Sequence, residues 1–123
     1  MGARVLVIED EPDIRFLTSL ILNHEGHTVL EASTGAEGLV RMRDQAPDLV
    51  LLDIRLPDMQ GWDVLKAARA EPETSKVPIV IMSAHSSGHT LDRAMMAGSN
   101  GYLVKPFKHE ELIAVVKKHS SSD

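Results

Sequence analysis

An unbroken apolar run that ends in an acidic residue constrains this chain more than any other feature. The run Leu49-Val50-Leu51-Leu52 leads directly into Asp53, and Pro57 follows shortly afterwards. Such a run, bounded by turn-forming residues, predicts a strand buried on both faces, as in a parallel sheet. A carboxylate at the end of this strand is costly unless water, a cation or a hydrogen-bond donor meets it. Asp53 is therefore a solvated strand end, a helix cap or part of a functional site.

Composition predicts one globular domain and excludes several kinds of chemistry. The chain has 123 residues, and we expect a domain over residues 1–119 followed by a tail or the start of a linker at 120–123. Cysteine is absent, which excludes thiolate catalysis and cysteine-ligated metals and suits a cytoplasmic location. The formal charge of −5 argues against nucleic-acid binding by this domain. No apolar run approaches the length of a membrane span, so no membrane contact is expected.

Five apolar stretches predict strands, and helical patterns separate them. The strands are expected at Arg4–Ile8, Thr28–Ala32, Leu49–Leu52, Val77–Met82 and Gly101–Val104. The helices are expected from Pro12 to Gly26, from Thr34 to Pro47, from Gly61 onwards, from Leu91 to Gly98, and up to His119. This alternation predicts an α/β fold: a single doubly wound, five-stranded parallel sheet with five helices covering both faces.

Apolar residues at helical spacing predict which side of each helix packs inward. The expected inward residues are Ile14, Leu17 and Ile21, widened by Phe16 and Leu20; Ala36, Leu39 and Val40; Val64, Leu65 and Ala68; Leu91, Ala94 and Met95; and Leu112, Val115, Val116 and His119. Thr34 and Glu37 have the spacing of a capping box. Ser86–His89 is expected to be a polar loop, and Met96 to lie on the helix surface or on an adaptable partner face.

Four of the predicted strands end in chemically useful residues, at Asp10, Asp53, Ser83 and Lys105. Parallel strands end at one edge of the sheet, where ligands bind in doubly wound folds. Two carboxylates ~4 Å apart repel by about 4 kcal/mol at an effective dielectric constant near 20. In a cluster of Glu9, Asp10 and Asp53, therefore, either the pKa of a carboxylate is raised or a cation is bound. Oxygen ligands of this kind suit Mg²⁺.

The same edge carries the parts needed to hold a phosphoryl group. Lys105 adds a positive charge and Ser83 a hydroxyl donor beside the carboxylates. An aspartate can act as a nucleophile that forms an acyl phosphate, and nearby cations stabilise the charge on the transferred oxygens. Asp53 is then the nucleophile.

A set of short motifs spans the chain: Val7-Ile8-Glu9-Asp10-Glu11-Pro12, Leu52-Asp53-Ile54-Arg55-Leu56-Pro57 with Gly61, Ser83-Ala84, Tyr102 and Lys105-Pro106-Phe107. In their order and separations they resemble the response-regulator receiver domains of two-component signalling, similar to the stand-alone chemotaxis-type regulators. The resemblance implies a flavodoxin-like fold with strand order 2-1-3-4-5. It also implies phosphoryl transfer to Asp53 from a histidine kinase or a phosphotransfer protein, in a domain that catalyses only its own phosphorylation and dephosphorylation.

The resemblance also implies roles for individual residues. Asp10 and Asp53 would supply carboxylate ligands to Mg²⁺, with Mn²⁺ as a substitute, and the backbone carbonyl of Arg55 would supply another. Glu9 would act mainly through a metal-bound water. Glu9 stands where aspartate is commoner in the family. Arg55 is also unusual at its position, and we expect its side chain to shield the phosphoryl group or pair with Glu9.

The remaining implied roles concern the switch. Ser83 and Lys105 would contact the phosphoryl group, and Tyr102 would be the aromatic residue whose rotamer follows Ser83. An output protein or an attached effector would bind the face made by the fourth helix, the fifth strand and the fifth helix. The domain would be a monomer or a phosphorylation-dependent dimer.

Three other functions remain to be weighed. A receiver-like interaction module that is never phosphorylated would have no need for Asp10, Asp53, Ser83 and Lys105. A phosphohydrolase of the haloacid-dehalogenase type requires a second aspartate where Arg55 stands. A flavin carrier would need a phosphate-binding loop where the chain has three acidic residues. His85 and His89 lie four residues apart but have no carboxylate partner, so we do not expect a metal site there.

Overall fold

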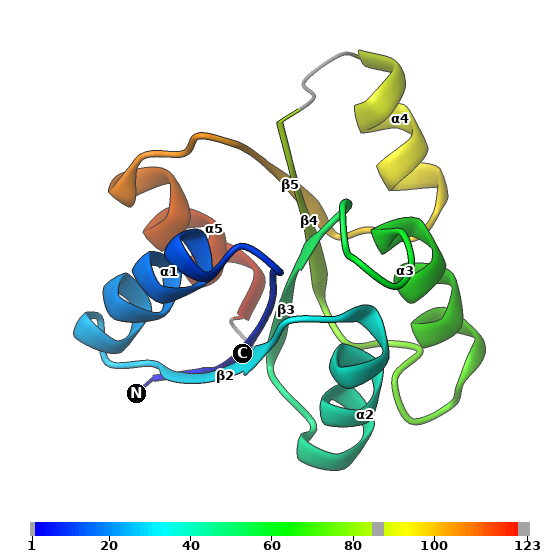
Figure 1. Ribbon diagram of the computed structural model, residues 1–123, viewed down its shortest axis with the longest axis horizontal. Coiled ribbons are helices and arrows are strands. Elements are labelled where there is room, and N and C mark those ends of the chain that lie inside the picture. Colours follow the sequence, from blue (N-terminus) through cyan, green and yellow to red (C-terminus); the bar gives the residue numbers. More distant parts are fainter. Residues whose placement is uncertain (1, 85–87, 121–123) are drawn as a thin grey trace.

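Strands and helices alternate along the chain in the computed structural model, which describes residues 2–84 and 88–120 (Figure 1). The elements are β1 (Arg4–Ile8), α1 (Pro12–His24), β2 (Thr28–Ala32), α2 (Gly35–Gln45), β3 (Leu49–Asp53), α3 (Gly61–Ala70), β4 (Ile79–Ser83), α4 (Gly88–Met96), β5 (Gly101–Val104) and α5 (His109–Ser120). Within the described residues, no helix is both long enough and apolar enough to cross a membrane.

The sheet has the predicted topology. Its five strands are all parallel and lie in the order β2-β1-β3-β4-β5. Ile8 pairs with Leu52 between β1 and β3, and Ser83 pairs with Val104 between β4 and β5. Because the strands end nearly in register, the residues that follow them are brought to one edge of the sheet.

Helices cover both faces of the sheet, as predicted. Helices α2, α3 and α4 lie on one side, and α1 and α5 lie on the other (Figure 1). Alternate strand residues pack into two separate apolar clusters, so the strands are buried from both sides. The first cluster centres on Leu6, Ile8, Val50, Leu52, Ile79 and Ile81, and the second on Val5, Val7, Leu49, Leu51, Val80 and Met82.

Helix α1 packs through a narrower face than its apolar stripe predicts. Ile21 and Leu22 are buried, but the side chains of Phe16 and Leu20 are 67% and 54% exposed. Leu17 is also exposed. The inward placement of Phe16, Leu17 and Leu20 was therefore wrong, because the apolar stripe is wider than the surface that the sheet and α5 offer to the helix.

Helix α2 is rotated relative to the prediction because glycine lets it approach the sheet closely. Gly38 faces β1, where a Cβ atom would lie 2.4 Å from Cδ1 of Ile8. Met42 is buried along the same side of the helix, whereas Ala36 and Val40, which we expected to point inward, are exposed. An apolar-periodicity argument gives glycine no weight, although here it forms the contact surface.

The N-terminus of α2 is capped nearly as predicted. Thr34 Oγ1 accepts a hydrogen bond from the backbone N–H of Glu37 at 3.1 Å. The Glu37 carboxylate accepts a hydrogen bond from the N–H of Ser33 at 3.0 Å. A capping box requires the N–H of Thr34, one residue later, as the donor. Thr34 is thus the N-cap, but the reciprocal bond is displaced.

The fourth helix begins earlier than expected and is more exposed. Residues 88 and 89, predicted as loop, belong to α4, and residues 85–87 lie outside the described part of the chain. Ala94 is buried as expected, but Met95 and Met96 are 64% and 89% exposed. The core placement of Met95 was wrong, because among the α4 side chains that the structure describes Ala94 faces the sheet and Met95 faces solvent.

Smaller differences affect two element boundaries. Strand β4 starts at Ile79, two residues later than predicted, because Pro78 has no N–H to donate to a neighbouring strand. Ser120, predicted to begin the tail, is the last residue of α5. In that helix, Leu112 and Val116 are buried as predicted.

The two sides of α1 should respond differently to truncation. We expect Leu22→Ala to lower the free energy of unfolding by about 3 kcal/mol, because Leu22 is fully buried. Phe16→Ala, on the same helix, should change it by less than about 0.5 kcal/mol. Urea unfolding of both variants measures this difference. A loss for Phe16→Ala as large as that for Leu22→Ala would contradict the observed orientation of the helix.

Candidate functional site

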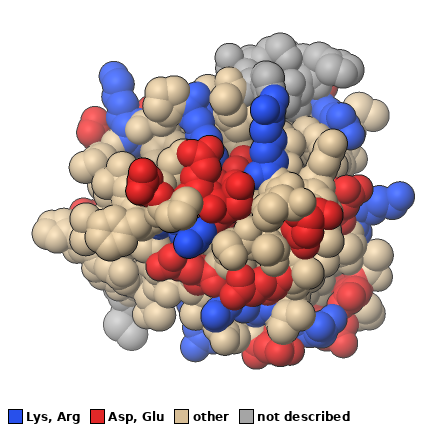
Figure 2. Space-filling view, viewed as in Figure 1, with Lys and Arg blue, Asp and Glu red and all other residues tan. Residues whose placement is uncertain are grey.

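A pocket of about 400 Å³ opens where β1, β3, β4 and β5 end. It is lined by Asp10, Glu11, Asp53, Arg55, Ser83, Ala84 and Lys105. The structure thus brings together the four residues that the sequence placed at this edge, together with Arg55. In the view of Figure 2, acidic side chains gather near the middle of the face and basic side chains lie around them.

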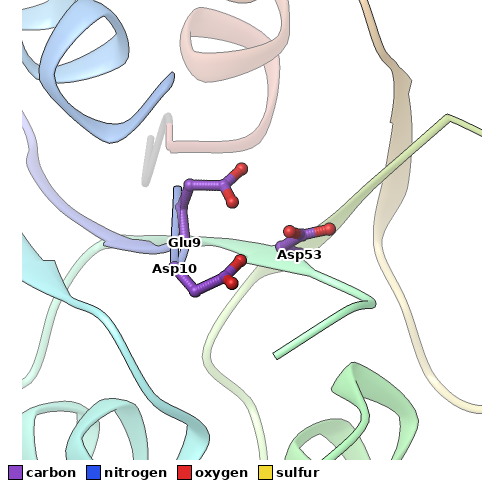
Figure 3. A group of neighbouring side chains, drawn as sticks. All are labelled: Glu9, Asp10 and Asp53. Atoms are coloured by element: carbon purple, nitrogen blue, oxygen red, sulfur yellow. The ribbon is translucent and has the colours of Figure 1, made fainter. Parts of the chain in front are cut away.

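Three carboxylates converge at this pocket. Glu9 and Asp10 extend from the end of β1 toward Asp53 at the end of β3 (Figure 3). One carboxylate oxygen from each of the three residues lies within 4.8 Å of the others. Glu9 is fully buried and Asp53 is 5% exposed, whereas Asp10 is more open. Two buried carboxylates at this separation need a compensating positive charge.

Lys105 supplies part of that charge from the far side of the site. Its Nζ atom lies 2.5 Å from Oε1 of Glu9 and 3.2 Å from Oδ2 of Asp53. If all three carboxylates are ionised, the ammonium leaves two negative charges unbalanced among these four groups. A single divalent cation would balance this charge, and the oxygen-only donor set fits Mg²⁺.

The surroundings of Glu9 raise its pKa. Burial, together with the neighbouring Asp53 carboxylate, raises the pKa of Glu9 to about 7, although the hydrogen bond from Lys105 opposes this shift. Burial alone would lower the pKa of Lys105, but its hydrogen bond to Glu9 and the charges of Glu9 and Asp53 outweigh burial and raise it. A cation held near Glu9 would favour its ionised form.

Backbone contacts fix the Glu9 end of the site. The N–H of Glu9 donates to the carbonyl of Ala32 at 3.0 Å, which continues the pairing of β1 with β2. The N–H of Glu11 donates to Oε2 of Glu9 at 3.2 Å. The two carboxylate oxygens of Glu9 are therefore held by different partners, Lys105 and Glu11.

Arg15 is a supporting residue that sequence reasoning missed. Its Nη1 atom donates to the carbonyl of Glu9 at 2.8 Å and more weakly to that of Asp10, and its Nε atom pairs with Glu31 of β2 at 3.1 Å. An arginine one turn into a helix resembles any solvated residue in sequence. Its pairing with Glu31 depends on the placement of β2 beside β1, which local sequence does not report.

The loop between β3 and α3 turns back on itself behind Asp53. The N–H of Arg55 donates to Oδ1 of Asp53 at 3.3 Å, and the N–H of Gly61 donates to the carbonyl of Ile54 at 2.6 Å. A Cβ atom at position 61 would lie 2.4 Å from the backbone oxygen of Asp53, so the turn requires glycine. The backbone of residue 55 is thereby held beside the Asp53 carboxylate.

Ser83 and Tyr102 lie on the same side of the sheet. Tyr102 pairs with Ile81 across β4 and β5, and both residues belong to the cluster under α2, α3 and α4. Ser83 follows Ile81 by two residues and so faces the same side. Ser83 is 4% exposed and lines the pocket. Ser83 and Tyr102, the two predicted switch residues, therefore lie on one face of the sheet.

Two expectations fall outside the described residues. They concern a metal site at His85 and His89, which we did not expect, and the first half of the polar loop Ser86–His89. Residues 85–87 and the side chain of His89 are not described. The rejected histidine metal site therefore stays a prediction. Ala84, which lines the pocket, was noticed in the sequence only as part of the Ser83-Ala84 motif.

Comparison with known proteins identifies similar sequences. Residues 5–117 match the family model described as Response regulator receiver domain. The DNA-binding response regulator MtrA of Mycolicibacterium smegmatis is 37% identical over 95% of this chain and 50% of its own length. The phosphate regulon transcriptional regulatory protein PhoB of Rhizobium meliloti is 34% identical over 95% of this chain and 52% of its own. The chain spans about half the length of these curated relatives.

Two solved structures of similar proteins share the fold over nearly their whole length. The chemotaxis protein CheY4 of Vibrio cholerae superposes with a TM-score of 0.91 at 28% identity and covers 97% of this chain and 99% of its own. The receiver domain of the sensor histidine kinase PA1611 from Pseudomonas aeruginosa has a TM-score of 0.90 at 29% identity, with 99% of this chain and 100% of that chain covered. That structure has a magnesium ion coordinated in its active site cleft.

The raised pKa of Glu9 predicts a pH-dependent stability in metal-free solution. Folded Glu9 keeps its proton up to about pH 7, whereas unfolded Glu9 loses it near 4.5. The free energy of unfolding should therefore fall as pH rises through this window, by up to about 3 kcal/mol relative to Glu9→Gln. Urea unfolding of both proteins with a chelator present gives this difference. Parallel pH profiles for the two proteins would contradict the assignment.

Proposed function

Because this chain belongs to the response regulator receiver family, we propose that Asp53 is the residue that accepts a phosphoryl group from a histidine kinase or a phosphotransfer protein. The observation that carries this proposal is the position of the Asp53 carboxylate, which lines the pocket 3.2 Å from the Lys105 ammonium and lies beside the carboxylates of Glu9 and Asp10. Of the three carboxylates, those of Asp10 and Asp53 line the pocket, and Asp53 is the more buried of these two.

The chemistry that these residues support is a displacement at phosphorus. An Asp53 carboxylate oxygen forms a bond to phosphorus as the bond from phosphorus to the donor imidazole nitrogen breaks, and the bonding electrons return to the imidazole. The product is an acyl phosphate. Lys105 already lies 3.2 Å from Oδ2 of Asp53 and is placed to stabilise charge on the phosphoryl oxygens. Ser83 would donate its hydroxyl to one of these oxygens.

The donor set supports a metal ion beside Asp53. Asp10, Asp53 and the backbone carbonyl of Arg55 would hold Mg²⁺ directly, and Glu9 would act through a metal-bound water. When bound, the ion supplies positive charge to the phosphoryl oxygens. Mn²⁺ accepts the same oxygen donors and is expected to substitute. The domain would catalyse only its own phosphorylation and dephosphorylation.

The output would be a change in packing that spreads from the site along the sheet. Phosphorylation adds about −1.5 to −2 charges, which would draw Ser83 and Lys105 inward and let Tyr102 follow. The partner-binding face would be formed by α4, β5 and α5, where Met95, Met96 and Val104 are exposed. An output protein or an attached effector would bind this face more tightly in one state, and the domain would be a monomer or a phosphorylation-dependent dimer.

A small phosphodonor tests the identity of the phospho-acceptor. We expect incubation with acetyl phosphate and Mg²⁺ to add one phosphoryl group to the wild type and none to Asp53→Asn, as measured by intact-protein mass spectrometry. Asp44→Asn, an exposed carboxylate on α2, is the matched control and should be modified like the wild type. Modification that survives Asp53→Asn would contradict the assignment of Asp53 as the phospho-acceptor, and a wild type that gains no phosphoryl group would support the alternative of a receiver-like interaction module working without phosphorylation.

Arg55 is expected to set the lifetime of the phosphorylated state. Its side chain lines the pocket, and its cation can shield the phosphoryl group from water. Arg55→Met keeps the backbone carbonyl and much of the side-chain volume, so it should change the dephosphorylation rate by more than about twofold. Loss of acyl phosphate after removal of the donor measures this rate. A rate within twofold of the wild type would contradict a role for Arg55 in setting this lifetime.

A further inference from the structure

A carboxylate outside the pocket joins the β3–α3 loop to the start of α2. Asp58 lies at the tip of this loop, three residues after Arg55. Its Oδ1 atom accepts the N–H of Gly35 at 2.8 Å, and its Oδ2 atom accepts the N–H of Ala36 at 3.0 Å. These two hydrogen bonds hold the pKa of Asp58 below its usual value. The first two amides of α2 thus find their acceptors on a different element.

The packing around this contact leaves little freedom. A Cβ atom on Gly35 would lie 2.6 Å from Cγ of Met59 and 2.9 Å from Val64 of α3. The loop therefore rests directly on the first residue of α2. Helices α2 and α3 lie side by side (Figure 1), and Asp58 connects their N-terminal ends through the loop.

The base of the same loop is closed near Asp53. The Gly61 amide bonds to the carbonyl of Ile54, and Arg55 pairs with Gln60 in an isolated bridge. With the base closed and the tip attached to α2, the path of residues 55–59 is determined at both ends. The backbone of residue 55, proposed above to offer its carbonyl to the metal, lies within this path.

We propose that Asp58 is a positioning residue for the metal site: by anchoring the loop tip to the N-terminus of α2, it holds the backbone carbonyl of Arg55 in place for Mg²⁺. This inference rests on the proposed function. A ligand held in place before binding loses less conformational entropy when the ion arrives, so release of the tip weakens binding without removing any ligand.

The chain offers a matched control at the same helix end. Thr34 Oγ1 caps the third amide of α2, that of Glu37, whereas within the described part of the chain the contacts to the β3–α3 loop at this helix end are those of Asp58 with Gly35 and Ala36. Thr34→Ala therefore weakens α2 capping without releasing the loop tip. Asp58→Asn removes the charge but keeps one acceptor oxygen, whereas Asp58→Ala removes both oxygens.

Mg²⁺ titration calorimetry on the full chain tests the proposal. We expect Asp58→Ala to raise the dissociation constant for Mg²⁺ about fivefold, Asp58→Asn to give an intermediate value, and Thr34→Ala to stay within about twofold of the wild type. In Mg²⁺-free solution, the Gly61 amide should exchange with solvent faster in Asp58→Ala than in Thr34→Ala.

Each other outcome overturns the proposal for a distinct reason. Equal losses in Asp58→Asn and Asp58→Ala would assign the effect to charge, and an equal loss in Thr34→Ala would assign it to the stability of α2. An unchanged dissociation constant in Asp58→Ala, with the wild type binding Mg²⁺, would contradict this inference alone. A wild type that binds no Mg²⁺ would also contradict the proposed function.

Discussion

The ion pairs of Lys105 with Glu9 and Asp53 are the interaction on which the rest of the site depends. They span the sheet edge from the end of β5 to the ends of β1 and β3, and they place one ammonium against two buried carboxylates. Burial of Glu9, together with the neighbouring Asp53 carboxylate, raises the pKa of Glu9 to about 7. An active site with unbalanced charge accepts a cation readily, because the cation relieves a repulsion that folding has already imposed.

This arrangement follows from the parallel sheet. Strands that start and end nearly in register deliver their last residues to one edge, and two apolar clusters hold the strands there from both sides. Close packing supports the edge at specific points, such as Gly61 behind Asp53 and Gly38 against Ile8. The loops are then attached to their neighbours by polar contacts, those of Arg15 and Asp58 among them. Rigid strands and anchored loops together keep the charged groups close.

The sheet and the positions of the edge residues could be predicted from sequence because both depend on local pattern. A buried apolar run identifies a strand, and parallel strands must end together, so Asp10, Asp53, Ser83 and Lys105 were expected at one edge. Helix orientation depends on which surface lies opposite, and apolar spacing does not report that. Phe16 and Met95 were therefore misplaced. Asp58 was missed for a related reason, since its partners Gly35 and Ala36 lie on another element and are distant in sequence.

If this edge of the sheet holds a metal ion and carries a phosphoryl group on Asp53, both should be visible in a crystal structure with Mg²⁺ and beryllofluoride, a phosphoryl mimic. We expect beryllofluoride on an Asp53 oxygen, with Lys105 and Ser83 contacting its fluorines. We also expect Mg²⁺ to be bound by the carboxylates of Asp10 and Asp53 and by the carbonyl of Arg55. Beryllofluoride on a different carboxylate, or Mg²⁺ bound away from this pocket, would show that Asp53 and its neighbours do not form the phosphorylation site.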